Sequence, residues 1–528
     1  MSLMKTVLKA EIVLDRQLSI PDAVAVVWGR ATLSLHARAR DRCRAAHRRL
    51  TRVIAEDRHV YGLTTGFGPL ANRLVDKESG VQLQQNLVYH LATGVGPNFD
   101  WASARAMVLA RLMSIVQGAS GASEHAIGAL MGMLNSDLSP CVPSQGTVGA
   151  SGDLTPLAHM VLCFQGRGAF TDQNDRMFEG ATGLERLGLS PIDLACRDGL
   201  ALVNGTSAMT GVAVLNADFS ERAVAWSIAL TAAMAETQQA RVEAWHPAFG
   251  ELRPHARQVD AARDLCLRVE GSDRVVRSHL ADRRLTNVGP VIEEQAGQDA
   301  YTLRCAPQVI GAVWDTLDWH NTVVLTELSS VTDNPIFPPT DADDLRVLHG
   351  GNFMGQHVGL ASDALANAIC VLAGLAERQV ARLTDETLNR GLPAFLHLGA
   401  PGLNSGLMGA QVTATALLAE MRTSGAASVQ SISTNGANQD VVSMGTIAAR
   451  MVQSKLKKLA QIQAIMGLAV AQAIDIQDEA QPDRMFSDSA LSIRDFIRQI
   501  SPPLKQDRPL GRDVEAIAQA LANNAPPA

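Results

Sequence analysis

The pattern of apolar and polar positions along the chain is typical of α-helices. Apolar residues gather on one side of a predicted helix at residues 102–117 and recur at spacings of three and four in two longer runs. The first long run follows Ser362, which we interpret as an N-cap, and the second covers residues 445–476. The runs consist of Leu365, Ile369, Leu372, Ala376, Val380 and Leu383, then Ile447, Met451, Leu459, Ile462, Met466 and Val470. Few segments alternate with the period of two that a half-buried strand needs, so the sequence predicts a mainly α protein.

The character of the chain changes near residue 204. Gly, Pro and Asn often interrupt the first part, and only short helical patterns lie between them, whereas long helical runs follow. A chain of 528 residues also exceeds what a single core usually holds. We therefore predict an N-terminal mixed domain over residues 1–204 and a helix bundle over residues 205–528.

Composition narrows the possible partners and the compartment. Charged residues make up 19% of the chain, below the usual quarter, which favours burial of surface against other subunits. The net charge is −7 and no basic block is present, which argues against a nucleic-acid partner. The seven cysteines are scattered without a C-x-x-C pair, as in reduced cytoplasmic proteins. Because no fully apolar stretch approaches a membrane span, we expect a soluble cytoplasmic protein.

The segment GTVGASGDLTPLAH at residues 146–159 carries the most unusual candidate chemistry. At its centre are Ala150, Ser151 and Gly152. Gly152 has no Cβ, so the backbone can fold back until the Gly152 nitrogen reaches the Ala150 carbonyl carbon. Closing that ring with loss of two waters would leave a 4-methylideneimidazol-5-one (MIO). This group is a strong electrophile, and it needs neither a metal nor pyridoxal phosphate.

The same tripeptide also occurs at residues 119–121, so it does not identify the reactive copy. Each copy precedes a predicted helix. Ser123 can cap the first helix, and Thr155 with Pro156 can open the second. An ordinary turn before a helix therefore explains either copy on its own.

The surrounding residues resolve this ambiguity by resemblance. The segment 146–159 resembles the signature of the aromatic amino acid ammonia-lyases and aminomutases, the family in which this tripeptide cyclises. Further ordered motifs resemble the same family: YGLTTGFG (61–68), ALVNGT (201–206), QDAYTLR (298–304), TDNP (332–335), HGGNFMG (349–355) and STNGANQD (433–440). The resemblance spans nearly the whole chain. It implies a mainly α fold with the MIO loop in the N-terminal domain, and a homotetramer whose active sites each draw residues from three chains.

The resemblance also assigns site residues. It implies that Tyr61, in a glycine-flanked loop that can act as a lid, is the catalytic base. Arg304 would bind the substrate carboxylate through its planar guanidinium. Without the resemblance, Tyr61 would be interpreted as a packing residue and Arg304 as a solvated surface charge. The remaining predicted residues are Asn204 and Tyr301 beside the electrophile, Asn334 near the carboxylate, Gln298 as a further substrate-binding residue, Asn435, Asn438 and Gln439 lining the pocket, and Glu420 in the amine region.

Substrate choice is predicted from His90 and Leu91. In the family these positions meet the far end of the substrate ring, where a histidine can hydrogen-bond a phenolic hydroxyl. Phenylalanine-selective members carry an aromatic residue in place of His90, and histidine-selective members carry Ser-His in place of His90-Leu91. The pattern is most similar to the bacterial tyrosine ammonia-lyase branch. We therefore expect L-tyrosine to be converted to p-coumarate, with L-phenylalanine as a second substrate.

Two alternatives remain open at this stage. A tyrosine 2,3-aminomutase uses the same residues but returns the ammonia to the β-carbon, and the sequence does not separate the two activities. A catalytically inactive helical scaffold is the second alternative. The simultaneous presence of Tyr61, Ser151, Asn204, Tyr301 and Arg304 argues against it.

Overall fold

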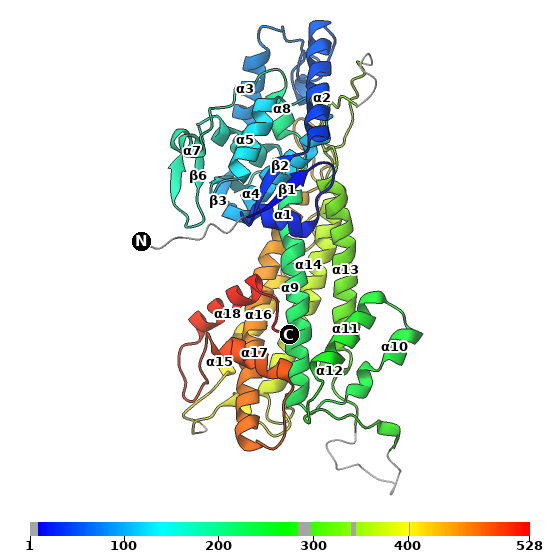
Figure 1. Ribbon diagram of the computed structural model, residues 1–528, viewed down its shortest axis with the longest axis vertical. Helices are drawn as coiled ribbons and strands as arrows, with labels where there is room; N and C mark the ends of the chain where they lie inside the picture. Colours follow the sequence, from blue (N-terminus) through cyan, green and yellow to red (C-terminus); the bar gives the residue numbers. More distant parts are fainter. Residues whose placement is uncertain (1–8, 283–296, 339–344, 401) are drawn as a thin grey trace. The chain divides into compact units, whose positions relative to one another are not determined.

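The computed structural model describes residues 9–282, 297–338, 345–400 and 402–528, and these are mainly α-helical (Figure 1). The chain divides into two units. Unit 1 comprises residues 1–218, 320–363 and 426–451, and unit 2 comprises residues 219–319, 364–425 and 452–528. This division differs from the linear boundary that we predict between residues 204 and 205, because two later segments return to unit 1.

Unit 1 contains short helices, small sheets and loops. Its elements are β1 (Ala10–Leu14), α1 (Ile20–Val27), β2 (Ala31–Leu35), α2 (Ala37–Ala55), the 3-10 helix η1 (Gly68–Leu70), α3 (Gly80–Leu91), β3 (Val95–Asn98), α4 (Trp101–Val116), α5 (Glu124–Leu134), β4 (Ser139–Pro140), β5 (Pro143–Gln145), α6 (Leu154–Phe164), β6 (Ala169–Thr171), β7 (Met177–Glu179), α7 (Gly180–Leu187) and α8 (Asp198–Val203). The strands form a parallel pair β1-β2, an antiparallel pair β3-β5 and an antiparallel sheet β4-β6-β7.

Unit 2 is helical in the part that the structure describes. Its elements are η2 (Val242–Trp245), α10 (Pro247–Leu252), α11 (Ala256–Arg268), η3 (Leu280–Asp282), α12 (Tyr301–Arg304), η4 (Ala394–Leu396), α15 (Met408–Arg422), α17 (Asp488–Arg498) and α18 (Gly511–Asn523). Four helices start in one unit and end in the other: α9 (Ser207–Thr237), α13 (Ala306–Leu328), α14 (Gln356–Thr384) and α16 (Gly445–Ala480).

The predicted helices form, with one error at a helix start. The pattern at residues 102–117 corresponds to α4 and that at 445–476 to α16. Ser362, however, is not an N-cap. Helix α14 begins at Gln356, and the Gly359 N–H already donates to the Gly355 carbonyl, so Ser362 is a buried residue inside the helix. Serine is common at caps, but interior packing overrides that preference here.

Helix α4 is the centre of unit 1. Asp100 caps it by accepting the Ser103 N–H at 2.7 Å, and every residue of the helix is buried. Arg105 projects from this helix and is completely buried, yet its guanidinium donates to the carbonyls of Val27 and Leu134 at 2.7 and 2.6 Å. The arginine therefore satisfies carbonyls near the C-terminal ends of α1 and α5, which would otherwise be buried without donors.

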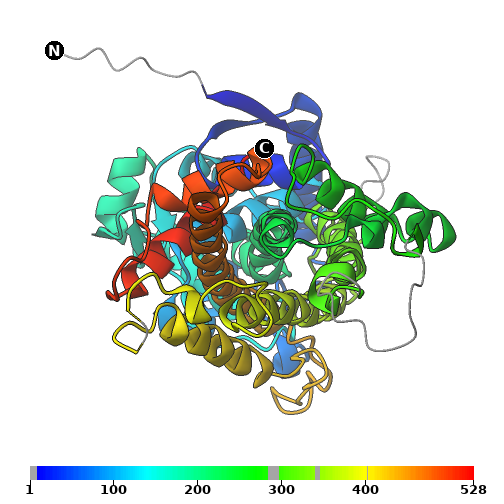
Figure 2. The same ribbon diagram turned by 90° about the horizontal axis from the view of Figure 1, so that it is seen from below.

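In unit 2 the long helices pack along one another around a core rich in alanine and leucine (Figures 1 and 2). Buried glutamines connect them. Gln379 of α14 donates to the Thr231 hydroxyl of α9 at 2.9 Å, and Gln463 of α16 donates to Ser227 at 2.9 Å. Because buried amides must be hydrogen-bonded, these pairs fix the register between the helices.

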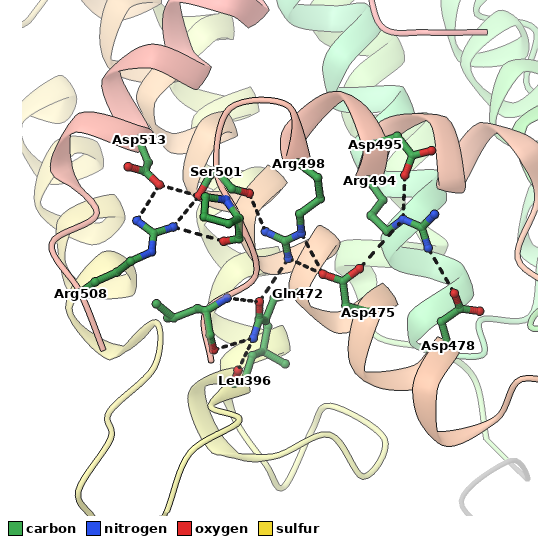
Figure 3. Close-up of polar contacts among 12 residues, drawn as sticks. Leu396, Gln472, Asp475, Asp478, Arg494, Asp495, Arg498, Ser501, Arg508 and Asp513 are labelled. Atoms are coloured by element: carbon green, nitrogen blue, oxygen red, sulfur yellow. Dashed lines mark hydrogen bonds and ion pairs between the residues drawn. The ribbon is translucent and has the colours of Figure 1, made fainter. Parts of the chain in front are cut away.

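A polar network joins the C-terminal helices of unit 2 (Figure 3). Gln472 of α16 is buried, donates to the carbonyls of Leu396 and Leu504, and accepts from Arg498 of α17 at 3.1 Å. Arg498 also pairs with Asp475 at 2.7 Å. The network thus joins α16, α17 and the segment around Leu504 that leads to α18.

Among the residues that the structure describes, two helices, α14 and α16, contain an 18-residue window long and apolar enough to cross a membrane by length and composition. In these windows 67% and 78% of the residues are buried inside the protein, as expected of core helices. All seven cysteines are free thiols.

Candidate active site

The Ala150-Ser151-Gly152 loop is shaped by two glycines with left-handed backbone. Gly149 has φ +70° and Gly152 has φ +72°, a region that favours glycine. A Cβ on Gly152 would overlap the Gly205 carbonyl, and one on Gly149 would overlap the Ser443 hydroxyl. The loop turns back on itself, since Ala150 and Gly152 form an isolated backbone bridge. Only glycine fits at either position.

Residues 442–448 of unit 1 support the loop from one side. The side chains of Val148 and Ala150 pack on an apolar cluster that consists of Ala427, Val442, Met444 and Ala448. The Met444 N–H donates to the Val148 carbonyl at 2.9 Å, and the Ser443 hydroxyl donates to the Gly149 carbonyl at 3.1 Å. On the other side, the Asp153 N–H donates to the Gly205 carbonyl at 2.8 Å. The loop is thus held between two segments distant in sequence.

Two of the predicted site residues contact Ser151. The Asn204 amide donates to the Ser151 carbonyl at 3.3 Å, and the Gln439 amide donates to the Ser151 hydroxyl at 3.2 Å. Asn204 is positioned as the C-cap of α8, and its carbonyl accepts from the completely buried Arg111. The Asn204 side-chain oxygen is buried without a partner in the described part of the chain, so it remains available as an acceptor.

The Tyr61 loop lies against the loop that carries Asn435 and Asn438. The Tyr61 hydroxyl accepts the Gly68 N–H at 2.9 Å, and the Phe67 ring meets the Tyr61 ring edge-on with centroids 6.0 Å apart. A Cβ on Gly68 (φ +52°) would come within 2.9 Å of the Asn435 amide and 3.9 Å of the Asn438 side chain. The structure therefore brings Tyr61, Asn435 and Asn438 into one region of unit 1.

Asn334 lies in a turn held by a buried ion pair. Its neighbour Asp333 forms a bidentate pair with Arg197, both bonds being 2.8 Å, and both side chains are completely buried. The Asn334 side-chain oxygen accepts the Gly350 N–H at 2.6 Å. His349, the preceding residue, accepts the Tyr61 N–H at 3.2 Å through Nε2. The first two residues of the motif at 349–355 therefore contact the Tyr61 loop and Asn334.

The second Ala-Ser-Gly copy lies in a structural junction. Ser120 is completely buried, and its carbonyl accepts from Arg197 at 2.7 Å. The Ala119 carbonyl accepts the Phe337 N–H at 2.9 Å. The following helix α5 is capped by Ser123, as predicted. These contacts are those of an ordinary buried turn.

The predicted selector residues lie at the end of α3. His90 is exposed, and its Nδ1 lies 2.9 Å from the Asn86 carbonyl. Leu91 is half-buried. Helix α3 packs against α6 and α8, the helices that follow the Ser151 loop and precede Asn204. The selector role of both residues stays a prediction.

Four predicted residues lie in unit 2. Three of them form a cluster at α12, where the Arg304 guanidinium lies 4.6 Å from the Tyr301 ring centroid and donates to the Gln298 side chain. Tyr301 is 69% exposed. Glu420 on α15 is exposed, with a carboxylate oxygen 3.7 Å from the Lys458 ammonium. The roles of Gln298, Tyr301, Arg304 and Glu420 stay predictions.

Comparison with known proteins identifies the family. A family model described as aromatic amino acid lyase matches residues 18–499. The chain belongs to the aromatic amino acid lyase family. It is 59% identical to a tyrosine ammonia-lyase of Cereibacter sphaeroides, over 98% of each chain. It is 37% identical to an MIO-dependent tyrosine 2,3-aminomutase of Streptomyces globisporus, over 93% of this chain and 91% of that protein.

The predicted fold class of this aromatic amino acid lyase is confirmed by a solved structure. The crystal structure of the Streptomyces globisporus tyrosine aminomutase aligns with a TM-score of 0.90 and 35% identity, and the alignment covers 97% of each chain. The family resemblance inferred from the motifs is therefore correct, and it extends over nearly the whole chain.

Asp153 is a buried titratable residue beside Gly152 that motif reasoning did not single out. It is completely buried directly after Gly152, and its carboxylate accepts the Met209 N–H at 2.8 Å and the Thr446 hydroxyl. Burial raises its pKa from 3.8 to about 6, the bonds from Thr446 and Met209 oppose this rise, and Glu327 adds to it. The sequence signal that could have identified it is an aspartate that directly follows Gly152 in the turn.

The raised pKa of Asp153 predicts a pH-dependent stability. The folded state binds the Asp153 proton more tightly than the unfolded chain, so this contribution is present below pH 3.8 and is lost as the pH rises through about 6. As the pH rises from 3.8 to about 6, the urea midpoint of the wild type should therefore decrease relative to the urea midpoint of Asp153→Asn. A difference between the two proteins that stays constant over this range would contradict the prediction.

Proposed function

We propose that the chain is a tyrosine ammonia-lyase that converts L-tyrosine to p-coumarate and ammonia. The observation that carries the proposal is the 59% identity to the Cereibacter sphaeroides tyrosine ammonia-lyase over 98% of both chains. Identity to the tyrosine 2,3-aminomutase is lower, at 37%. Both relatives are named for tyrosine, and the lyase is much more similar to this chain. We therefore favour elimination over amine migration.

The loop geometry supports formation of MIO from Ala150, Ser151 and Gly152. A glycine with φ +72° occupies the position whose nitrogen must close the ring, where a Cβ would overlap Gly205. Asn204 donates to the Ser151 carbonyl, which becomes part of the ring, and Gln439 contacts the hydroxyl that leaves as water. When formed, the group supplies an electrophile toward the amine or the ring of the substrate. No metal or pyridoxal phosphate enters this proposal.

The side chains around the loop then have distinct tasks. Tyr61 removes the β-proton, with its hydroxyl oxygen held by the Gly68 N–H. Asn334 and Arg304 bind the carboxylate, with Gln298 supporting Arg304. Tyr301 and Asn204 act beside the electrophile, Asn435, Asn438 and Gln439 line the pocket, and Glu420 serves the amine. His90 and Leu91 receive the far end of the ring.

Assembly and location complete the proposal. Tyr301 is 69% exposed, which is unusual for a residue with a catalytic task and supports completion of each site by other copies of the chain. We expect the family's homotetramer with shared active sites, located in the cytoplasm, in keeping with the seven free thiols.

Product analysis tests the function directly. The purified protein is incubated separately with L-tyrosine, L-phenylalanine and L-histidine, and the products are followed by ultraviolet absorbance and chromatography. The expected main product is p-coumarate, with slower formation of cinnamate. β-Tyrosine in place of p-coumarate would identify an aminomutase, and no product from any of the three would support an inactive scaffold.

The proposed cofactor predicts a mass change that depends on Ser151. Intact wild-type protein should be lighter than its translated sequence by two waters. Ser151→Ala should recover one or both of those waters and lose nearly all activity. Ser120→Ala is the matched control, because it alters the buried second copy, and it should retain the mass loss. A wild-type mass equal to the translated sequence would exclude the ring.

Substrate choice is predicted to depend on His90. A neutral hydrogen bond contributes about 0.5–1.5 kcal/mol, so the tyrosine preference from this contact should be roughly ten-fold. His90→Phe removes the partner and adds an apolar wall, so the ratio of kcat/KM for tyrosine over phenylalanine should fall by ~10-fold or more. The mass loss should persist. If the ratio does not change, His90 has only a packing role.

A further inference from the structure

A buried glutamine of α3 connects three elements that carry proposed site residues. Gln84 is completely buried, and both its amide nitrogen and its amide oxygen form hydrogen bonds. Its nitrogen donates to the Gly62 carbonyl at 2.8 Å, and its oxygen accepts the Leu200 N–H at 2.9 Å. Gly62 follows Tyr61 directly, and Leu200 lies in α8, the helix that Asn204 caps.

The packing around Gln84 leaves little freedom for the connected elements. Gly62 has φ +70°, and a Cβ there would come within 2.8 Å of the Leu200 side chain. A Cβ on Gly199 would come within 2.9 Å of the Gln84 carbonyl oxygen and 3.0 Å of its side-chain oxygen. The Tyr61 loop, α3 and α8 are therefore closely packed at Gln84.

Gln84 is placed to control the position of the Tyr61 hydroxyl. Tyr61 is anchored by His349 at its own N–H, by Gly68 at its hydroxyl and by Gln84 at the next carbonyl. Loss of the Gln84 side chain would leave the Gly62 carbonyl without its side-chain donor. The backbone that follows Tyr61 would then no longer be held to α3. Displacement of a reacting group by about 1 Å can cost ~100-fold in rate.

We infer that Gln84 is a positioning residue for the reaction, one that holds the Tyr61 loop in register with α8 and Asn204. The inference rests on the proposed function, which assigns the base to Tyr61. The Gln84 amide hydrogen-bonds two backbone groups, the Gly62 carbonyl and the Leu200 N–H, so it acts through the position of Tyr61 and not on the substrate.

The test compares Gln84→Met with Gln85→Met. Methionine matches the length of glutamine but makes neither amide bond. Gln85 is the matched control, since it is the next residue of the same helix and also makes two amide bonds, with Gln165 at 3.2 and 2.7 Å. Gln84→Met should lower kcat for tyrosine by ~10–100-fold with a smaller change in KM. Gln85→Met should stay within about 3-fold of wild type, and both variants should keep the two-water mass loss.

A double-mutant cycle with Tyr61→Phe separates positioning from general destabilisation. If Gln84 acts through the Tyr61 hydroxyl, Gln84→Met should have much less effect on kcat when that hydroxyl is absent. An equal fold-loss in both backgrounds, or an equal loss in Gln85→Met, would overturn the inference. Tyr61→Phe alone should lower kcat by ~10²–10⁴-fold, and near-normal kcat in that variant would refute the proposed base, whatever Gln84 does.

A second variant covers the case in which Gln84→Met does not fold. Gln84→Glu keeps the size and the oxygen that accepts the Leu200 N–H but, when ionised at about pH 9, has no donor for the Gly62 carbonyl. Its mass loss and oligomer size report folding independently of activity. A folded Gln84→Glu protein with wild-type kcat at that pH would also overturn the inference.

Discussion

The close approach of two peptide backbones, at Gly152 and Gly205, is the constraint on which the site depends. No side chain fits on either residue. A Cβ on Gly205 would meet the Arg111 guanidinium and the Thr332 side chain, just as one on Gly152 would meet Gly205. Because the two segments touch through backbone atoms, Asn204 is brought within reach of the Ser151 carbonyl. The Ala150-Ser151-Gly152 loop and Asn204 therefore meet at this junction.

Buried charges surround that junction, and each has a different compensation. Arg197 and Asp333 neutralise one another in a bidentate pair. Arg111 binds the Asn204 carbonyl, and burial lowers its pKa to about 10, against the opposing effect of Asp333. Asp153 is compensated by an N–H and a hydroxyl. Taking such groups out of water costs free energy, so their concentration here favours positional precision over stability.

Sequence patterns predicted the elements better than their assembly. The periodicity of apolar residues located α4 and α16 because packing follows the helical repeat. It misplaced the start of α14, because a serine within a buried helix resembles a cap. The division at residue 204 did not anticipate the return of residues 320–363 and 426–451 to unit 1, since long-range contacts leave no local signal.

The same limit applies to the site. The motifs marked Tyr61, Ser151, Asn204 and Gln439, which the structure places in one unit, because each motif has a distinctive local pattern. Asp153 and Gln84 were not predicted as site residues. The structure shows that both are completely buried. Their importance lies in the partners they reach, Met209 and Leu200 among them, and partners distant in sequence have no spacing rule. Arg304 and Tyr301 were recognised by motif, yet their cluster at α12 lies in unit 2.

The discontinuous construction of unit 1 has a consequence for the order of events during synthesis. Ser443 and Thr446, which hold the loop from one side, follow Gly149 and Asp153 by 294 and 293 residues. At about 5–20 residues per second, a ribosome needs roughly 15–60 s to make that stretch. During this interval the loop lacks the hydrogen bonds from the Ser443 and Thr446 hydroxyls. The loop therefore gains its full set of contacts only after residue 446 has been made, so the proposed ring closure depends on a segment that is synthesised late.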